Sequence, residues 1–169
     1  MKLQELLTAR TRRDFTVPAM DPLREDDALQ EAQVLDVRVI SALGVVGVLF
    51  ELRTALQLRG SHAGLLVARG VRELTWSAPT RDTPLTAWAV GSSRPVLGRD
   101  FELTLSMWPS PGAQLVLRAE SAEFLMGNIA GLESTPPNYS SSLEKVLRQL
   151  PDWQSDFAVQ NRSFVAANL

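Results

Sequence analysis

The sequence predicts an α+β fold: an antiparallel β-sheet meander of six to eight strands with short helices at the N- and C-terminal ends. Three observations predict it. Apolar and polar residues alternate through much of residues 33–125, which is the period of strands with one buried face. These runs follow one another without long helical segments between them, which favours antiparallel over βαβ pairing. Helical spacing occurs only near the chain ends. A closed or half-open barrel is the chief alternative.

Length and composition fit one ordinary globular domain. The chain has 169 residues, of which 45% are hydrophobic and 21% charged, and single domains commonly span about 100–200 residues. We therefore expect residues 1–169 to form a single domain.

The N-terminal segment is predicted to be helical over residues 2–13. Its apolar stripe is Leu3, Leu6 and Leu7, with Arg10 completing the i, i+3, i+4, i+7 spacing. Arg10, Arg12 and Arg13 would gather at the helix C-terminus, where the helix dipole favours cations. Residues 14–28 are predicted to form a connector.

The predicted sheet core covers residues 33–125. Alternation begins at 35–39 and continues through 46–54, with Gly44 as the hairpin residue between them. Gly70 interrupts the next run, which suggests a bulge or a close approach of backbone. Later strands are indicated at 85–90, 101–107 and 115–124. Residues 108–112, Trp-Pro-Ser-Pro-Gly, are predicted to join the last two as a hairpin.

Helical spacing returns at residues 141–150. Ser141 and Glu144 have the spacing of a capping box, and Pro151 ends the helix. The predicted apolar face consists of Leu143, Val146, Leu147 and Leu150. We expect it to pack on the sheet, and we expect residues 158–169 to be a loosely held tail.

Residue counts exclude several kinds of chemistry. The chain has no cysteine, which removes disulfides, thiolate metal sites and thiol nucleophiles. Its single histidine, His62, falls in a predicted exposed loop, so a multi-histidine metal site cannot form and a serine–histidine relay is disfavoured. No phosphate-binding glycine motif is present. We expect no metal, no cofactor and no enzymatic activity.

Carboxylate chemistry is the alternative that residue counts leave open. Glycoside hydrolysis needs only two carboxylates at a set separation, and several glutamates fall on predicted strands: Glu51, Glu102, Glu120 and Glu123. Arg53 shares the polar face of its strand with Glu51, and Arg118 shares another with Glu120. Such alternating charges more often form cross-strand pairs on a solvated face.

Charge and hydropathy bear on location and partners. The net charge is −2 and the pI about 5.5, which disfavours nucleic acid as a partner because duplex binding requires clustered cations. No apolar run of signal-peptide length precedes Arg10, and the longest apolar stretch, residues 42–50, is far short of the ~20 residues that span a bilayer. We therefore expect a cytoplasmic protein that binds no membrane.

Two features suggest a surface that binds another protein. Trp108 opens the predicted hairpin and should be partly exposed, and exposed tryptophans are frequent interface anchors. An acidic segment could attract a cationic partner; its candidate residues are Asp21, Glu25, Asp26 and Asp27. A solvated connector is the other interpretation of this segment. The remaining tryptophans are expected in structural roles, Trp88 in the core and Trp153 with Phe157 holding the tail.

Two stretches carry a resemblance. Residues 45–53, Val-Val-Gly-Val-Leu-Phe-Glu-Leu-Arg, and 70–76, Gly-Val-Arg-Glu-Leu-Thr-Trp, resemble segments of uncharacterised actinobacterial proteins, which have no assigned activity. The layout of residues 34–125 is also similar to small β-meander immunity proteins of bacterial toxin systems. That resemblance implies a bacterial protein with another protein as its partner, and it identifies no functional residue.

The resulting hypothesis is a non-enzymatic protein-binding module of the immunity or accessory type. The alternative is a small-molecule-binding protein or a carboxylate-based enzyme, with a pocket between the sheet and the helices. A homodimer formed across an unpaired sheet edge is left open.

Overall fold

The computed structural model describes residues 1–10 and 14–167, and it contains one seven-stranded antiparallel sheet. The strands are β1 (Gln33–Ile40), β2 (Val45–Glu51), β3 (Ala63–Ser77), β4 (Trp88–Leu97), β5 (Phe101–Trp108), β6 (Ala113–Ile129) and β7 (Phe157–Ala166). The helical elements are the 3-10 helices η1 (Leu3–Leu7) and η2 (Ser41–Leu43) and the α-helix α1 (Leu143–Arg148). The antiparallel sheet is thus confirmed, but the fold is mostly β because the helices are few and short.

The sheet closes on itself. Its strand order is β3-β2-β1-β4-β5-β6-β7, and β3 also pairs with β6, so the first six strands form a ring. Closure is narrow on one side, where β1 and β4 share only the pairs Gln33 with Ala89 and Val34 with Trp88. The strands are therefore two meanders, β1–β3 and β4–β7, joined in the half-open barrel that was the alternative to one continuous meander.

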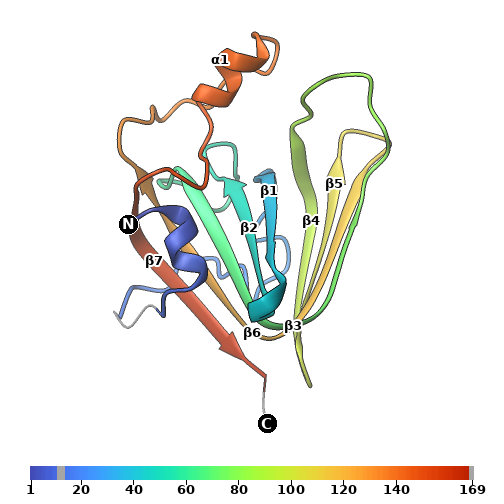
Figure 1. Ribbon diagram of the computed structural model, residues 1–169, viewed down its shortest axis with the longest axis vertical. Helices are drawn as coiled ribbons and strands as arrows, with labels where there is room; N and C mark the ends of the chain where they lie inside the picture. Colours follow the sequence, from blue (N-terminus) through green and yellow to red (C-terminus); the bar gives the residue numbers. More distant parts are fainter. Residues whose placement is uncertain (11–13, 168–169) are drawn as a thin grey trace.

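The long strands β3 and β6 run through both parts of the ring. Figure 1 shows them bending together at the lower end, which gives the sheet a V shape in this view. The bend occurs at Gly70, whose φ of 64° is in the left-handed region, and the register shifts just after it, between Val71 and Glu73. The predicted bulge is confirmed.

We call residues 63–69 of β3 with 121–129 of β6 the covered half, and 71–77 of β3 with 113–119 of β6 the open half. The covered half pairs outward with β2 and β7. In the open half, β6 pairs with β5, whereas β3 has no second neighbouring strand among the described residues.

Two apolar clusters stabilise the sheet. The larger fills the ring and includes Phe50, Phe101 and Phe124. The smaller lies outside the covered half, where η1 and Trp153 pack against Leu65 and its neighbours. The predicted burial of Leu3, Leu6 and Leu7 and the holding role of Trp153 and Phe157 are confirmed.

The N-terminal helix is shorter than predicted. It is a five-residue 3-10 turn, Leu3–Leu7, instead of a helix over 2–13; Arg10 is exposed, and Arg12 and Arg13 lie outside the described residues. The backbone amides of Leu3 and Gln4 donate to Ser155 O and Trp153 O at 3.1 and 3.0 Å. These two amides belong to the first turn and have no acceptor within the helix, so the C-terminal chain satisfies the start of η1.

The predicted loose tail is wrong. Residues 157–166 form β7, which pairs with β6 from Ile129 to Ser121, and Ala167 N–H donates to Glu120 O at 2.8 Å. The alternation is irregular because the buried positions of β7 include Ser163, which is hydrogen-bonded, as well as Phe157 and Val165. Residues 168 and 169 of the predicted tail lie outside the described part of the chain.

The C-terminal helix lies where it was predicted, but its apolar face does not pack on the sheet as predicted. α1 spans Leu143–Arg148, and the Ser142 hydroxyl accepts from Lys145 N–H at 3.4 Å, so Ser142 is the cap. Only Val146 is buried, whereas Leu143 and Leu147 are 42% and 51% exposed. The outer face of the covered half is already occupied by η1 and Trp153, which leaves α1 at the end of the barrel (Figure 1).

In the part of the chain that the structure describes, no helix has the length and apolarity needed to cross a membrane. The apolar stretch at 42–50 forms most of η2 and β2.

Candidate functional site

Trp108 ends β5 and is 49% exposed, as predicted. Its neighbour Met107 points into the core, so the alternation of the strand turns Trp108 outward. The hairpin that follows is held by Arg81, whose Nη2 donates to Pro109 O at 2.6 Å and to Pro111 O at 2.8 Å. The Arg81 guanidinium also lies 4.8 Å from the ring centroid of Trp88. Trp108 is thus presented from a braced hairpin.

Trp108 lines a hollow of about 490 Å³, which we call the Trp108 hollow. Other residues lining it are Glu31, Gln33, Arg81, Leu85 and Thr86. A second hollow of about 350 Å³, the Leu147 hollow, lies on the other side of Leu85 and Thr86, which line both. Gln33 borders the first and Val34 the second, so the hollows flank the short pairing of β1 with β4.

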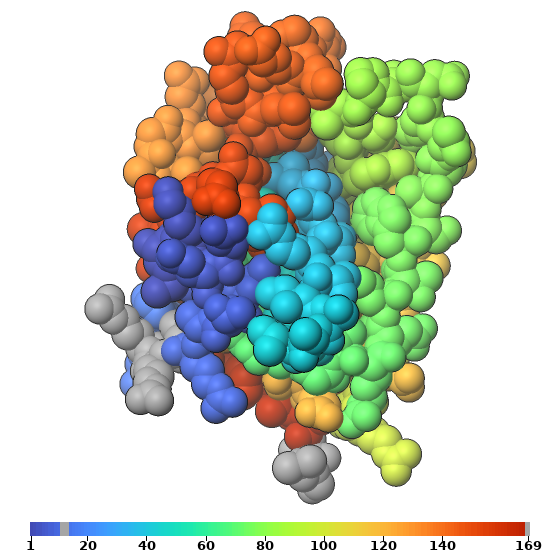
Figure 2. All heavy atoms as spheres, in the orientation of Figure 1, coloured from blue at the N-terminus to red at the C-terminus, as the bar shows by residue number. Residues whose placement is uncertain are grey.

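The Leu147 hollow has an apolar floor and an exposed apolar rim. Leu35, Leu49 and Trp153 line it, and Leu147 and Leu150 approach from the α1 segment. Figure 2 shows the blue surface of β1 recessed between the orange segment that carries α1 and the green segment before β4.

Trp153 is fixed on this floor by three contacts. Its Nε1 donates to Asp36 Oδ2 at 2.6 Å, and the Arg38 guanidinium lies 4.6 Å from its ring centroid. Gly47 lies beneath the ring, where an added Cβ would come within 3.1 Å of Trp153 and would clash with Leu7. The floor is therefore formed before any ligand or partner arrives.

Asp21 is not an available binding residue, which corrects the prediction. It is only 5% exposed and forms an ion pair with Arg24 at 2.6 Å. Its carboxylate also accepts from Ser163 Oγ at 2.7 Å and from Leu23 N–H at 2.9 Å. The residue ties the connector to β7, and sequence alone could not show this because Ser163 lies 142 positions away.

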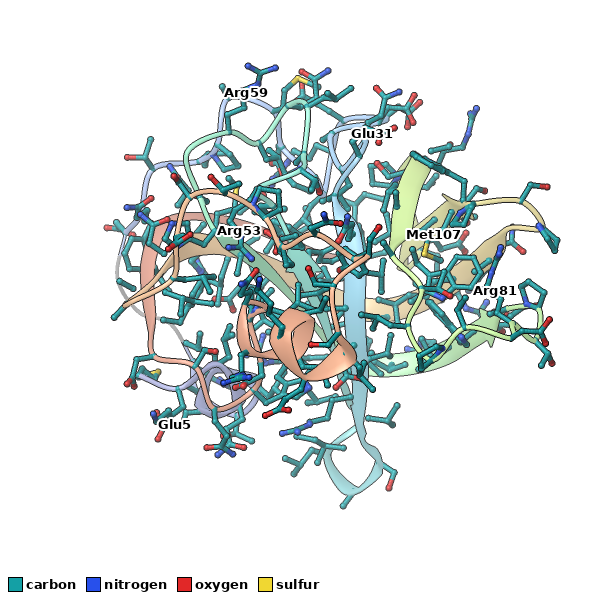
Figure 3. The ribbon with its side chains drawn as sticks, turned by 90° about the horizontal axis from the view of Figure 1, so that it is seen from above. Glu5, Glu31, Arg53, Arg59, Arg81 and Met107 are labelled. Atoms are coloured by element: carbon teal, nitrogen blue, oxygen red, sulfur yellow. The ribbon has the colours of Figure 1, made fainter. Side chains whose placement is uncertain are left out.

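The other predicted acidic residues, Glu25, Asp26 and Asp27, are exposed. Asp27 also binds β4: its N–H donates to Ser93 O at 2.8 Å, and its Oδ1 accepts from Ser93 N–H at 3.1 Å. Glu31 N–H donates to Val90 O at 2.8 Å, which places Glu31 in the Trp108 hollow. In Figure 3, Glu31, Met107 and Arg81 lie on the same side of α1. Glu31 therefore lies beside Trp108, whereas the four predicted acidic residues do not line the hollow.

Glu51 and Arg53 form a buried ion pair instead of the expected solvated pair. Their side chains are 0% and 2% exposed, and Arg53 Nη2 lies 2.6 Å from Glu51 Oε2. The remaining guanidinium donors bind the carbonyl oxygens of Glu133, Thr135 and Gln149 at 2.7–3.1 Å. Arg53 thus holds the segment between β6 and β7 onto the end of the barrel.

Tyr139 lies beside this ion pair. Its hydroxyl donates to Gln33 Oε1 at 2.7 Å. Burial, together with the negative charge of Glu51, raises the pKa of Tyr139 to about 12. The burial of Glu51 and Arg53 and the place of Tyr139 beside them were not predicted; the available signal was a Glu-x-Arg at the end of the otherwise apolar β2.

The other strand glutamates are also paired or exposed. Glu123 is 2% exposed and lies between Arg69 and Arg162, at 3.3 and 3.0 Å. Glu120 pairs with Arg72 at 3.0 Å, and Glu102 is exposed on β5. The two buried glutamates, Glu51 and Glu123, thus have the partners expected of structural charges.

No protein-family model, curated protein or solved structure matches this chain.

Proposed function

We propose that this chain is a protein-binding module of the immunity or accessory type, and that it binds its partner at the Trp108 and Leu147 hollows. One observation carries the proposal: two adjoining hollows each have a large, half-exposed apolar side chain at the rim, 49% for Trp108 and 51% for Leu147. Exposed apolar residues beside pockets are typical anchors of protein interfaces.

The surroundings of the two anchors support an interface. Arg81 and Glu31 line the Trp108 hollow, and Asp36 and Asp152 line the Leu147 hollow. An apolar centre with a polar rim is the usual composition of a specific interface. Braced elements hold both anchors, since Arg81 fixes the hairpin of Trp108 and Arg53 fixes the segment that carries α1. Little ordering is then required on association.

A small apolar molecule in the Leu147 hollow is the second candidate. This hollow lies between β1 and the α1 segment, and its volume of about 350 Å³ is within the range of ligand pockets. The interior of the ring, in contrast, is filled by side chains such as Phe50 and Phe101.

The test compares two double variants as bait in extracts of the source organism. Trp108→Ser with Leu147→Ser removes both anchors. Val96→Ser with Leu97→Ser is the control, because these residues are 57% and 45% exposed at the far end of β4. We expect one protein to bind the wild type and the control in a fixed ratio, and to be lost from the anchor variant.

Equal retention by both variants would overturn the proposed surface. Native mass spectrometry of the purified chain separates the two candidates. A bound small molecule that is lost on Leu147→Ser, with no protein retained by the bait, would favour the small-molecule alternative.

A further inference from the structure

A third hollow, of about 390 Å³, lies in the connection between β2 and β3. We call it the Ser61 hollow. Its lining includes Leu52, Leu56, Arg59, Ser61, His62 and Ser134. The connection contributes all of these except Ser134, which comes from the segment after β6.

His62 presents a hydrogen-bond donor to this hollow. Its Nδ1 accepts from Ile129 N–H at 3.1 Å, so the neutral ring carries its proton on Nε2. The backbone N–H of His62 also donates to Asn128 Oδ1 and Gly127 O, at 3.1 and 3.0 Å. His62 lines the hollow, and its Nε2 forms no hydrogen bond within the described residues, so Nε2 is the ring donor left for a ligand. His62 is thus half-buried and oriented, where the sequence predicted an exposed loop residue.

Ser61 adds a hydroxyl group to the lining of the hollow. The residue is 5% exposed and forms no side-chain hydrogen bond within the described residues, and its Oγ is not among the fully buried atoms that lack a partner. The hydroxyl group is therefore accessible and can donate a hydrogen bond to a ligand in the hollow.

The charge of the lining is positive. Arg59 forms no ion pair within the described residues, and only its Nε is engaged, donating to Leu56 O at 3.2 Å. Arg53 also lines the hollow, but Glu51 neutralises it. The lining residues include no carboxylate. Converging donors beside an unpaired guanidinium favour an oxyanion.

We propose that the Ser61 hollow binds a small organic anion through its phosphate or carboxylate group. Ser61 Oγ, Ser134 Oγ, His62 Nε2 and Arg59 donate to the oxyanion, and the apolar part of the ligand contacts Leu52 and Leu56. The site shares Thr54 with the Trp108 hollow, but none of the four proposed donors lines either hollow of the proposed partner surface, so either proposal can fail alone.

The test is an amide chemical-shift titration of the full chain with three probes: inorganic phosphate, phenyl phosphate and benzoate. We expect saturable shifts at Ser61, His62 and Ser134. Phenyl phosphate should bind about tenfold more tightly than inorganic phosphate, because its ring buries apolar surface. Tighter binding of benzoate than of phenyl phosphate would assign the site to carboxylates, and the reverse order to phosphates.

Two variants and a control locate the effect. Arg59→Gln and Ser61→Ala should each weaken the preferred probe at least about tenfold, since each removes a hydrogen bond to a charged group. Arg99→Gln removes an exposed arginine from the β4–β5 turn and should leave affinity unchanged. If the Arg59→Gln variant fails to fold, the affinity of the Ser61→Ala variant still tests the proposal. Absence of saturation with all three probes, or equal weakening by Arg99→Gln, would overturn the proposal.

Discussion

The covered and open halves of the barrel are built from the same two strands, yet they are buried differently. Along β3, residues 63–68 are all buried, whereas residues 71–77 include five exposed residues and none that is buried. β6 runs in the opposite direction, so its open half comes first: buried positions alternate with exposed or half-buried ones through 113–119, and burial is continuous from 122 to 127. Strand pairing is antiparallel throughout, so strand direction does not explain the difference, although β3 pairs with β2 only in the covered half.

The difference comes from a second layer. Outside the covered half, η1, Trp153 and Phe157 bury the outward side chains of β3 and β6. Outside the open half, the corresponding positions carry residues such as Thr75, Gln114 and Arg118. One strand can therefore read as a continuous apolar run in one half and as an alternating pattern in the other.

The largest expected effect on stability comes from comparing Arg53, which holds the segment between β6 and β7 on the end of the barrel, with Arg72 in the open half. Arg53→Met should lower the free energy of unfolding by about 3–5 kcal/mol, because Glu51 would stay buried without a partner. Arg72→Met should cost less than about 1 kcal/mol, since its side chain is 52% exposed. Denaturant titration measures both. Glu51→Gln combined with Arg53→Met should recover part of the loss; equal losses for Arg53 and Arg72 would contradict the assignment.

The outward side chains give the next comparison. Leu65→Ala should cost about 2–5 kcal/mol, because the leucine is fully buried between the sheet and its second layer. Val116→Ala, at a half-buried outward position of the open half, should cost about 1 kcal/mol or less. Thermal and denaturant unfolding measure the two costs. A similar loss for both would mean that the second layer adds little stability.

Two glycines test how closely the second layer approaches. Gly47→Ala should destabilise by about 1–3 kcal/mol, because the new Cβ would clash with Leu7 and crowd Trp153. Gly98→Ala, at the β4–β5 turn, should change stability by less than about 0.5 kcal/mol, since no atom lies within 4 Å of its Cβ. Unchanged stability of the Gly47 variant would place η1 and Trp153 farther from β2.

The smallest effect is a pH dependence at Tyr139, the only tyrosine in the chain. Its pKa is raised from 10.0 to about 12 by burial and by Glu51. The folded state then holds a proton that the unfolded state loses, so the contribution is complete below pH 10 and is lost as pH rises to 12. Partial solvent access limits it to about 1–2 kcal/mol.

Tyrosinate absorbance reports the titration directly, and unfolding at several pH values reports the linked stability. Tyr139→Phe should remove this part of the alkaline loss. A midpoint near 10 in the folded protein would show that the covering segment does not bury the hydroxyl.

Much of the strand pattern was predictable because it depends on neighbours in sequence. The β1–β2 hairpin at Gly44, the bulge at Gly70 and the hairpin after Trp108 all follow from local backbone requirements. The failures share another cause. Residues 157–166 form a strand, and α1 leaves Leu147 exposed, because of what lies beside them in space.

The residues of the candidate site were likewise predictable only where their position depends on neighbours in sequence. Trp108 was identified because a hairpin that follows an alternating strand turns one side chain outward. The exposure of the acidic segment was predicted only in part, since the carboxylate of Asp21 already accepts hydrogen bonds from Arg24 and Ser163. Neither Leu147 nor Ser61 could be found, because the hollows beside them are formed by segments distant in sequence.

By itself, the sequence determined a cysteine-free chain with an antiparallel sheet and an exposed Trp108, since periodicity, turn residues and residue counts are local properties. Only the tertiary structure decided that the sheet closes through β3 and β6, that Glu51 and Arg53 are buried, and where the hollows lie. The physical reason is that burial of a side chain depends on every segment that covers it, and the covering segments here, η1 and the chain after β6, come from opposite ends of the sequence.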